Sequence, residues 1–278
     1  MQKSFDVTGP VVLEVKLASG EIEIDASLEG RAEVELIAHD EESQRLVDAA
    51  RVELAGDRLL VDVPQRRGGF SLGLVFGRHG ITCRILCPEG SGVSARTKSA
   101  DILVRGTIDG LDVQTASGDV EAGRVEAGAN VKSASGDVRI GTVGRDLSVQ
   151  TASGDVEVDA VHGAVSIAGV SGDVVIREAS GNVSVSTVSG DQEHGAVVAG
   201  KVAAHSVSGD VRIGVRRGSR VYLDCNSVSG DTSSELELTG EPPAGDGPLV
   251  EIRAKTVSGD IRIVRAPAPV GDTQEVHA

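Results

Sequence analysis

The chain has 278 residues, of which 40% are hydrophobic and none is tryptophan, so it can bury a sizeable core built from aliphatic side chains. Its formal net charge of -15 excludes a nucleic-acid partner, because binding to a phosphate backbone needs clustered Lys and Arg, and it disfavours an anionic membrane surface. With no 18-residue apolar run and no signal-like start, we expect a cytoplasmic protein without direct membrane insertion, a surface location being the alternative.

Residues 1–92 are predicted to form a β-rich section that caps one end of the fold. "LEVKLASGEIEI" (residues 13–24) places its apolar residues around Ser19-Gly20 at the offsets of the repeat described below, so this section is expected to be partly in phase with that repeat. "DEESQRLVDAARV" predicts a short helix with Asp40 as its N-cap. "QRRGGFSLGLVFGRHG" (residues 65–80) predicts a Gly-rich loop, and we expect its Arg66, Arg67, Phe70 and Phe76 to offer a docking surface.

The three cysteines do not form a CxxC pair. Cys83, Ile85 and Cys87 alternate on one face of a predicted strand, which favours a core position for both thiols. His79 alone would not complete a zinc site with them. We therefore predict no metal and no cofactor.

Residues 93–265 carry a regular repeat. The triplet Ser-Gly-Asp returns every 18 residues at Ser117, Ser135, Ser153, Ser171 and Ser189, and then at Ser208, Ser229 and Ser258. Counted from each Ser as position 0, apolar residues recur at +3, +5, +8, +12, +14 and +17, that is, as two similar nine-residue halves. Short alternating runs of Val and Ile at a fixed period are typical of stacked strands.

The fold class predicted from this pattern is all-β: a single-stranded parallel β-solenoid, or β-helix, with 18-residue coils made of two nine-residue halves. Each coil should add its strands to those of the coil before it, at about 4.8 Å. An insertion, "LTGEPPAGDGP", predicts a surface loop, and residues 266–278 predict a Pro-rich disordered tail that blocks further coils.

The Ser-Gly-Asp triplet itself predicts a tight corner, with Gly allowing a positive φ and the polar side chains accepting turn amides. The Asp residues should stack as one column, which is either purely structural or a weak cation column. An outward ladder of hydroxyls, such as Thr115 with Ser117, would suit ordered water and so ice binding. The corner residues are Ser117, Asp119, Ser135, Asp137, Ser153, Asp155, Ser171, Asp173, Ser189 and Asp191.

The repeated "SGDV" steps, led in by "FDVTGPVVLEVKLASGEIEI", resemble a bacterial family of β-strand-repeat domains of unknown function, the "putative adhesins" of DUF4097 type. The likeness runs from Phe5 to about Val264. It implies a right-handed solenoid and, for some members, a place at the cell surface or in envelope-stress sensing. The family supplies no catalytic residues.

The function expected is that of a non-enzymatic scaffold or interaction module, which presents an extended acidic surface to a protein or a cell-envelope component. A cation-binding solenoid, or a self-assembling one similar to the bactofilins, is the alternative to a monomer that binds partners. A polysaccharide-active enzyme is disfavoured, because aromatic sugar platforms and a Ser/His/Asp arrangement are missing. Arg216, Arg217 and Arg220 form a second basic group that could dock a partner.

Overall fold

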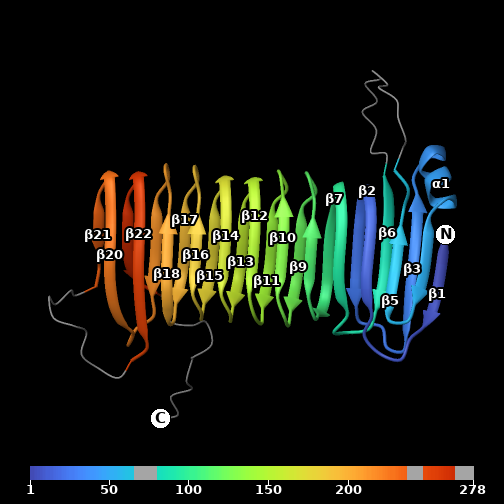
Figure 1. Ribbon diagram of the computed structural model, residues 1–278, viewed down its shortest axis with the longest axis horizontal. Helices are drawn as coiled ribbons and strands as arrows, with labels where there is room; N and C mark the ends of the chain where they lie inside the picture. Colours follow the sequence, from blue (N-terminus) through green and yellow to red (C-terminus); the bar gives the residue numbers. More distant parts are fainter. Residues whose placement is uncertain (66–79, 237–246, 267–278) are drawn as a thin grey trace, which may run out of the picture. The chain divides into compact units, whose positions relative to one another are not determined.

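The computed structural model describes residues 1–65, 80–236 and 247–266. The chain divides into two compact units, Met1–Val156 and Glu157–Ala278, which are taken in turn below. In the described residues of both units, all regular elements except helix α1 are β-strands, and most strands pair in parallel as the repeat predicts (Figure 1).

The regular coils of the N-terminal unit begin at β7. This long strand pairs in parallel with β8 through its first half and with β9 through its second half. Residues 18 apart then lie side by side, as Ala129 does with Leu147 and Val120 with Val138. The strands are β7 (Gly92–Ile108), β8 (Leu111–Gln114), β9 (Val120–Val125), β10 (Ala129–Ser133), β11 (Val138–Val143) and β12 (Leu147–Ser153).

The first section of this unit holds a coil that is out of sequence order. Strand β2 (Val12–Ala26) pairs in parallel with β7, and on its other edge with β5 (Arg58–Asp62) and β6 (Ile81–Cys87). It therefore lies between coils that follow it in the chain, as Figure 1 shows. Its Ser19 lies beside Ser99, and its Ile22 beside Ile102.

Antiparallel strands close the outer side of this coil. Strand β3 (Arg31–Ala38) pairs antiparallel with β6, β1 (Gln2–Asp6) pairs antiparallel with β3, and β4 (Arg51–Ala55) pairs antiparallel with β5. Helix α1 (Glu41–Asp48) begins after its predicted N-cap, whose Asp40 carboxylate accepts a hydrogen bond from the Ser43 amide at 2.7 Å. The predicted β-rich section with one short helix is thus confirmed, while the Gly-rich loop lies mostly outside the described residues.

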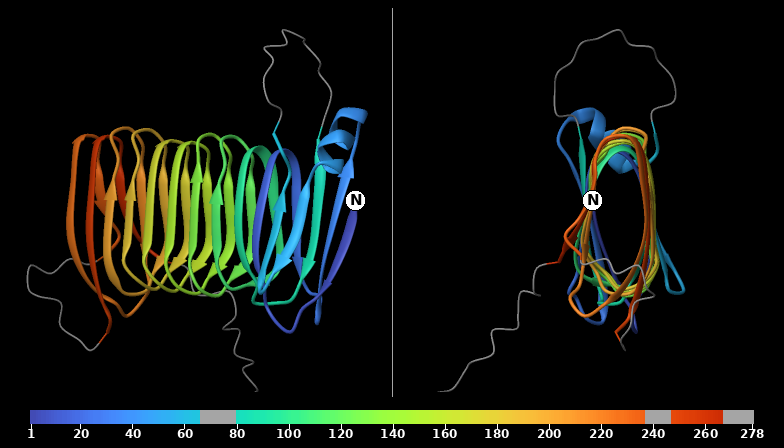
Figure 2. Two further views of the ribbon diagram at one scale, coloured as in Figure 1. Left: turned by 45° about the vertical axis from the view of Figure 1, so that its right-hand side comes forward. Right: turned by 90° about the vertical axis from the view of Figure 1, so that its left-hand side faces the viewer.

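The C-terminal unit repeats the same coil. Strands β14, β16 and β18 form one parallel sheet and β15, β17 and β19 the other, and in the right-hand view of Figure 2 the coils of this unit follow one flattened outline. The strands are β14 (Val165–Ser171), β15 (Val174–Ala179), β16 (Val183–Ser186), β17 (Gln192–Val197), β18 (Gly200–His205) and β19 (Val211–Val215), and β13 (Val156–Val161) begins at the boundary of the units.

The last two coils of this unit are exchanged relative to the sequence. Strand β22 (Leu249–Ser258) pairs with β18, and β23 (Ile261–Arg265) pairs with β19. The earlier strands β20 (Arg220–Ser229) and β21 (Thr232–Ser234) pair with the outer edges of β22 and β23 (Figure 1). The expectation that coils stack in chain order is therefore wrong at this point. The predicted tail from residue 267 lies outside the described residues, as does most of the predicted "LTGEPPAGDGP" loop.

Most of the predicted core positions are buried between the two sheets of a coil. Examples in the N-terminal unit are Val120 at +3, Val125 at +8 and Val131 at +14, each no more than 1% exposed. The residue at position +17 was also expected to point inward. This prediction is wrong, because Val170 and Val188 are 51% and 46% exposed. The two nine-residue halves are thus not equivalent, because the corner at Ser-Gly-Asp is not filled by the residue that precedes the triplet.

Candidate functional site: the Ser-Gly-Asp corner

Glycine is required at the corner by the coil beside it. A Cβ atom on Gly136 would lie 2.0 Å from the Gly118 carbonyl oxygen, and one on Gly118 would lie 1.9 Å from that of Ala100. In these N-terminal coils the corner glycines do not adopt a positive φ, contrary to expectation, whereas Gly190 in the other unit does, at 126°. Close backbone approach is therefore the constraint common to both units.

The residue two before the triplet's Ser points into the corner. Gly118 N–H donates to Thr115 Oγ1 at 2.9 Å, and Gly136 N–H donates to Ser133 Oγ at 2.8 Å. In the C-terminal unit, Thr187 and Ser206 at this position are buried. Because these hydroxyls serve the corner instead of solvent, the outward hydroxyl ladder needed for ice binding is not formed.

The Asp residues make a hydrogen-bonded ladder between coils. In the N-terminal unit, Asp137 N–H donates to Asp119 Oδ1 at 2.9 Å, and Asp155 N–H to Asp137 Oδ1 at 3.0 Å. In the C-terminal unit the ladder runs Asp173, Asp191, Asp210, Asp260 and Asp231, with N···O distances of 2.8 to 2.9 Å. It follows the spatial order of the coils, including the exchanged pair.

We propose a structural role for this column. Each of these bonds joins a carboxylate to an amide of the next coil, and charge-assisted bonds of this kind offset repulsion between neighbouring carboxylates. Arg139 and Arg262 add ion pairs to Asp137 and Asp260 at 3.0 and 2.9 Å. Within the residues that the structure describes, no group of three or more His, Cys, Asp or Glu side chains could hold a metal ion.

The corner of the C-terminal unit exposes one valine per coil, directly before each triplet Ser. We call these five residues the valine column. They lie in neighbouring coils, because Ser189 N–H donates to the Val170 carbonyl at 2.7 Å and Ser208 N–H to that of Val188 at 2.8 Å. Their exposed fractions are 51% for Val170, 46% for Val188, 49% for Val207, 49% for Val257 and 78% for Val228.

The triplet serines Ser117, Ser135, Ser153, Ser171, Ser189 and Ser208 are all exposed. In the C-terminal unit, each triplet serine stands in the chain between a valine of the valine column and an Asp of the hydrogen-bonded ladder. The sequence had marked this corner as a turn, but it had assigned the valines to the core. The signal that separates them is the hydroxyl two residues before the triplet, which occupies the inside of the corner.

Only part of the predicted basic docking surface can be placed. Arg66, Arg67, Phe70 and Phe76 lie outside the described residues. Arg216 forms an ion pair with Glu178 at 3.0 Å, and Arg220 Nε donates to the Gly247 carbonyl at 2.9 Å. Arg217 is exposed. Two of these three arginines thus hold structural contacts inside the C-terminal unit.

Cys83 and Cys87 occupy the predicted core positions. Cys83 and Cys87 are buried and free, and burial raises the pKa of their thiols to about 12 and about 11. Cys225 is half-buried, and burial also raises the pKa of its thiol. Such thiols are poor nucleophiles, because the thiolate is the reactive form.

One coil of the C-terminal unit has a polar interior. His194 and Gln192 occupy the +5 and +3 positions of β17, where neighbouring coils carry Ile176 and Ile213 beside the histidine. His194 is 1% exposed, neither ring nitrogen has a hydrogen-bond partner in the described residues, and burial lowers its pKa to about 4. Gln192 Nε2 donates to Thr187 Oγ1 and to the His205 carbonyl, both at 2.8 Å.

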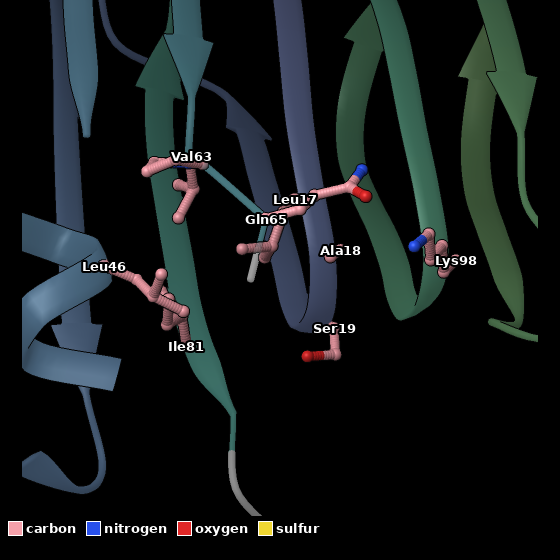
Figure 3. Close-up of a pocket in the computed structure, with 9 residues that line it drawn as sticks. Leu17, Ala18, Ser19, Leu46, Val63, Gln65, Ile81 and Lys98 are labelled. Atoms are coloured by element: carbon pink, nitrogen blue, oxygen red, sulfur yellow. The ribbon is translucent and has the colours of Figure 1, made fainter. Parts of the chain in front are cut away.

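The N-terminal unit has two hollows that are alternative candidate sites. The one in Figure 3, of about 190 Å³, lies beside α1 and is lined by Leu17, Leu46, Val63 and Ile81 with Lys98 at its edge. A wider hollow of about 730 Å³ is lined by His39, which is hydrogen-bonded to Thr82 at 2.9 Å, and by Arg84, which is paired with Glu23 at 2.6 Å. The wider hollow is also lined by Ser19, Ser99, Glu21 and Asp101, but the hydrogen bond of His39 goes to Thr82 and not to any of these four residues.

In the part of the chain that the structure describes, no helix has the length and apolar content needed to cross a lipid bilayer.

The close approach at the corner makes a direct prediction. Gly136→Ala should lower the free energy of unfolding by about 3 kcal/mol or more. The added methyl group would overlap the carbonyl oxygen of Gly118, which cannot shift without moving the backbone of its coil. Gly110→Ala is the matched control, since its Cβ would lie 3.7 Å from the nearest atom. Urea unfolding compares the two, and equal stabilities would contradict the proposed constraint.

His194 predicts a pH dependence of stability. The pKa of His194 in the folded protein, about 4, lies below the ordinary value of 6.5. The contribution of the neutral His194 to the free energy of unfolding is therefore complete above pH 6.5 and is lost as the pH falls toward 4. The loss should be on the order of 3 kcal/mol. His194→Ile should remove this part of the dependence in urea titrations between pH 7 and 4. Parallel pH profiles for the two proteins would contradict it.

The comparisons with known proteins agree with this architecture. The family model described as Toastrack DUF4097 matches residues 11–264. No curated protein matches the chain significantly. A solved "putative adhesin" of Bacteroides fragilis is similar with 13% identity and a TM-score of 0.50, covering 95% of this chain and 96% of that one.

Two further solved structures are more distant. A "putative adhesin" of Parabacteroides distasonis has 12% identity and a TM-score of 0.47, with 94% and 96% of the two chains covered. One of Parabacteroides merdae has 12% identity and a TM-score of 0.38, with 95% and 96% covered. The family model covers nearly the whole chain, and the coils have the predicted solenoid arrangement. The chain therefore belongs to the Toastrack DUF4097 family.

Proposed function

We propose that this protein is a non-enzymatic interaction module that binds a macromolecular partner along the valine column of its C-terminal unit. The observation that carries the proposal is the exposure of these five valines, which is between 46% and 78%. Exposed apolar side chains scattered singly are ordinary, but a contiguous row of them is typical of an interaction surface.

The coil does not need valine at this position. The N-terminal unit builds the same corner with Ala116, Ala134 and Ala152, which are also exposed. A preference of β-branched residues for extended backbone would favour valine in both units, and so it does not explain the difference between them. The valines therefore add apolar surface without adding to the core.

The charge beside the valine column defines the partner's chemistry. Three residues after each valine comes an Asp of the ladder, so the apolar row is flanked by a row of carboxylates. A complementary partner offers apolar side chains next to Lys or Arg, as one face of a basic amphipathic helix does. Successive helix turns are about 5.4 Å apart, close to the coil spacing of about 4.8 Å.

The similar solved structures described as adhesins support a protein or a cell-envelope component as the partner. The chemistry of the described residues supports a role without catalysis. His194, the histidine with a strongly lowered pKa, is buried in the core, and the corner offers Asp carboxylates that are already bonded to amides. A nucleic acid is disfavoured by the net charge of -15.

The proposal predicts that removing the valines weakens binding without unfolding the protein. The probe is a fluorescent synthetic helix with Leu on one face and flanking Lys, titrated by anisotropy. V188S/V207S/V257S should weaken binding at least tenfold, because each valine buried by the probe contributes about 1 kcal/mol. D191N/D210N/D260N keeps the ladder acceptors and should flatten the salt dependence.

The matched control is A116S/A134S/A152S, which changes the same corner position in the N-terminal unit and should bind as the unaltered protein does. Equal binding by all three variants would show that the valine column is not the contact. Unchanged circular dichroism and melting temperature are required of each variant.

A further inference from the structure

The C-terminal unit ends in an open coil. Among the described residues, β20 pairs only with β22, and β21 only with β23. The left-hand view of Figure 2 shows β20 and β22 as the last strands of this unit. An unpaired strand edge is a template for pairing with another chain.

The interior of this coil is covered from one side only. In β20 the side chains of Val221, Leu223 and Cys225 are half-exposed. Their neighbours in β22, which include Val250 and Ile252, are fully buried. The difference arises because β22 has a strand on each side and β20 has one.

The hydrogen-bonding groups of β20 are available at the same edge. Arg220 N–H donates to the Pro248 carbonyl at 2.9 Å, on the side of β22. Because successive residues of a strand direct their amides to opposite sides, Val221 and Leu223 direct theirs to the open edge. The inward apolar residues are thus also the ones with unpaired backbone groups in the described part of the unit.

The N-terminal unit shows how this chain closes a comparable end. There, β3 and β4 add antiparallel to the outer edges of β6 and β5. Such a strand ends parallel stacking and covers the interior. The open end of the C-terminal unit lacks an equivalent among the described residues.

We propose that β20 of a second copy provides this antiparallel strand, in a two-fold symmetric dimer. With the axis at Tyr222, Arg220 lies opposite Asp224 of the second copy and Val221 lies opposite Leu223 of the second copy, each pair occurring twice. This register joins opposite charges on the outer face and apolar side chains on the inner one. Asp224 and Tyr222 are both exposed, Tyr222 by 54%.

The local charge permits this contact despite the acidic chain. Arg217 lies just before β20 and Arg220 is its first residue, and these two charges reduce the repulsion that a net charge of -15 would otherwise cause at this edge. The basic group predicted as a docking surface thus lies beside the proposed dimer contact. Of the valine column, Val228 lies on β20, and V188S/V207S/V257S leaves that strand unchanged, so the two tests alter different residues.

The proposal is tested by charge reversal and rescue, measured by sedimentation equilibrium. The unaltered protein should have twice the 28.5 kDa mass of one chain. R220D and D224R each place like charges opposite one another, and each should raise the dimer dissociation constant at least tenfold. R220D/D224R restores opposite charges and should restore the dimer.

Arg262→Asp, on the outward face of β23, is the control that should leave the dimer unchanged. A monomer at all concentrations would overturn the proposal. Open-ended filaments, or single reversals without effect on the mass, would overturn it as well. Circular dichroism at each mass measurement shows whether a variant is folded.

Discussion

The structure depends on how closely the backbones of neighbouring coils approach at the Ser-Gly-Asp corner. A methyl group on Gly136 would overlap the carbonyl oxygen of Gly118, so that only glycine lets one corner lie against the next. At this spacing an Asp carboxylate reaches the amide of the following Asp, as Asp119 does to Asp137. The same spacing aligns the apolar residues of the strands and the residue before each triplet. The valine column is therefore a product of the corner that holds the coils together.

Much of the coil was predictable from the sequence, because the inward positions alternate with the period of a strand. Val120, Val125 and Val131 are buried where the repeat placed them. The exposed row was not predicted, since the two nine-residue halves have nearly the same pattern of apolar residues. They differ in one physical respect: at the triplet corner a hydroxyl such as that of Ser133 satisfies the glycine amide and occupies the inside of the turn. The preceding residue is left outside.

The order of the coils could not be predicted from the repeat. Strands β2 and β22 each lie between strands that are distant from them in the chain. Their apolar residues nevertheless follow the same pattern as those of any other coil. Since every coil offers a similar edge, the pattern does not say which edges meet. The strands at the two ends determine where stacking stops. In one unit β3 adds antiparallel, and in the other β20 pairs on one edge only among the described residues. These features also determine which surfaces are left for partners.

The most direct test of corner stacking is disulfide trapping in a Cys225→Ser background. Ser208 lies beside Ser258, and Ser258 beside Ser229, so Ser208 and Ser229 are two coil spacings apart. Cysteines at neighbouring positions, about 4.8 Å apart, meet the geometry of a disulfide, whereas a separation of about 10 Å does not. The account predicts that S208C/S258C oxidises completely under mild conditions and that S208C/S229C stays reduced. The opposite result would contradict both the exchanged coil order and the stacking on which the proposed interaction surfaces depend.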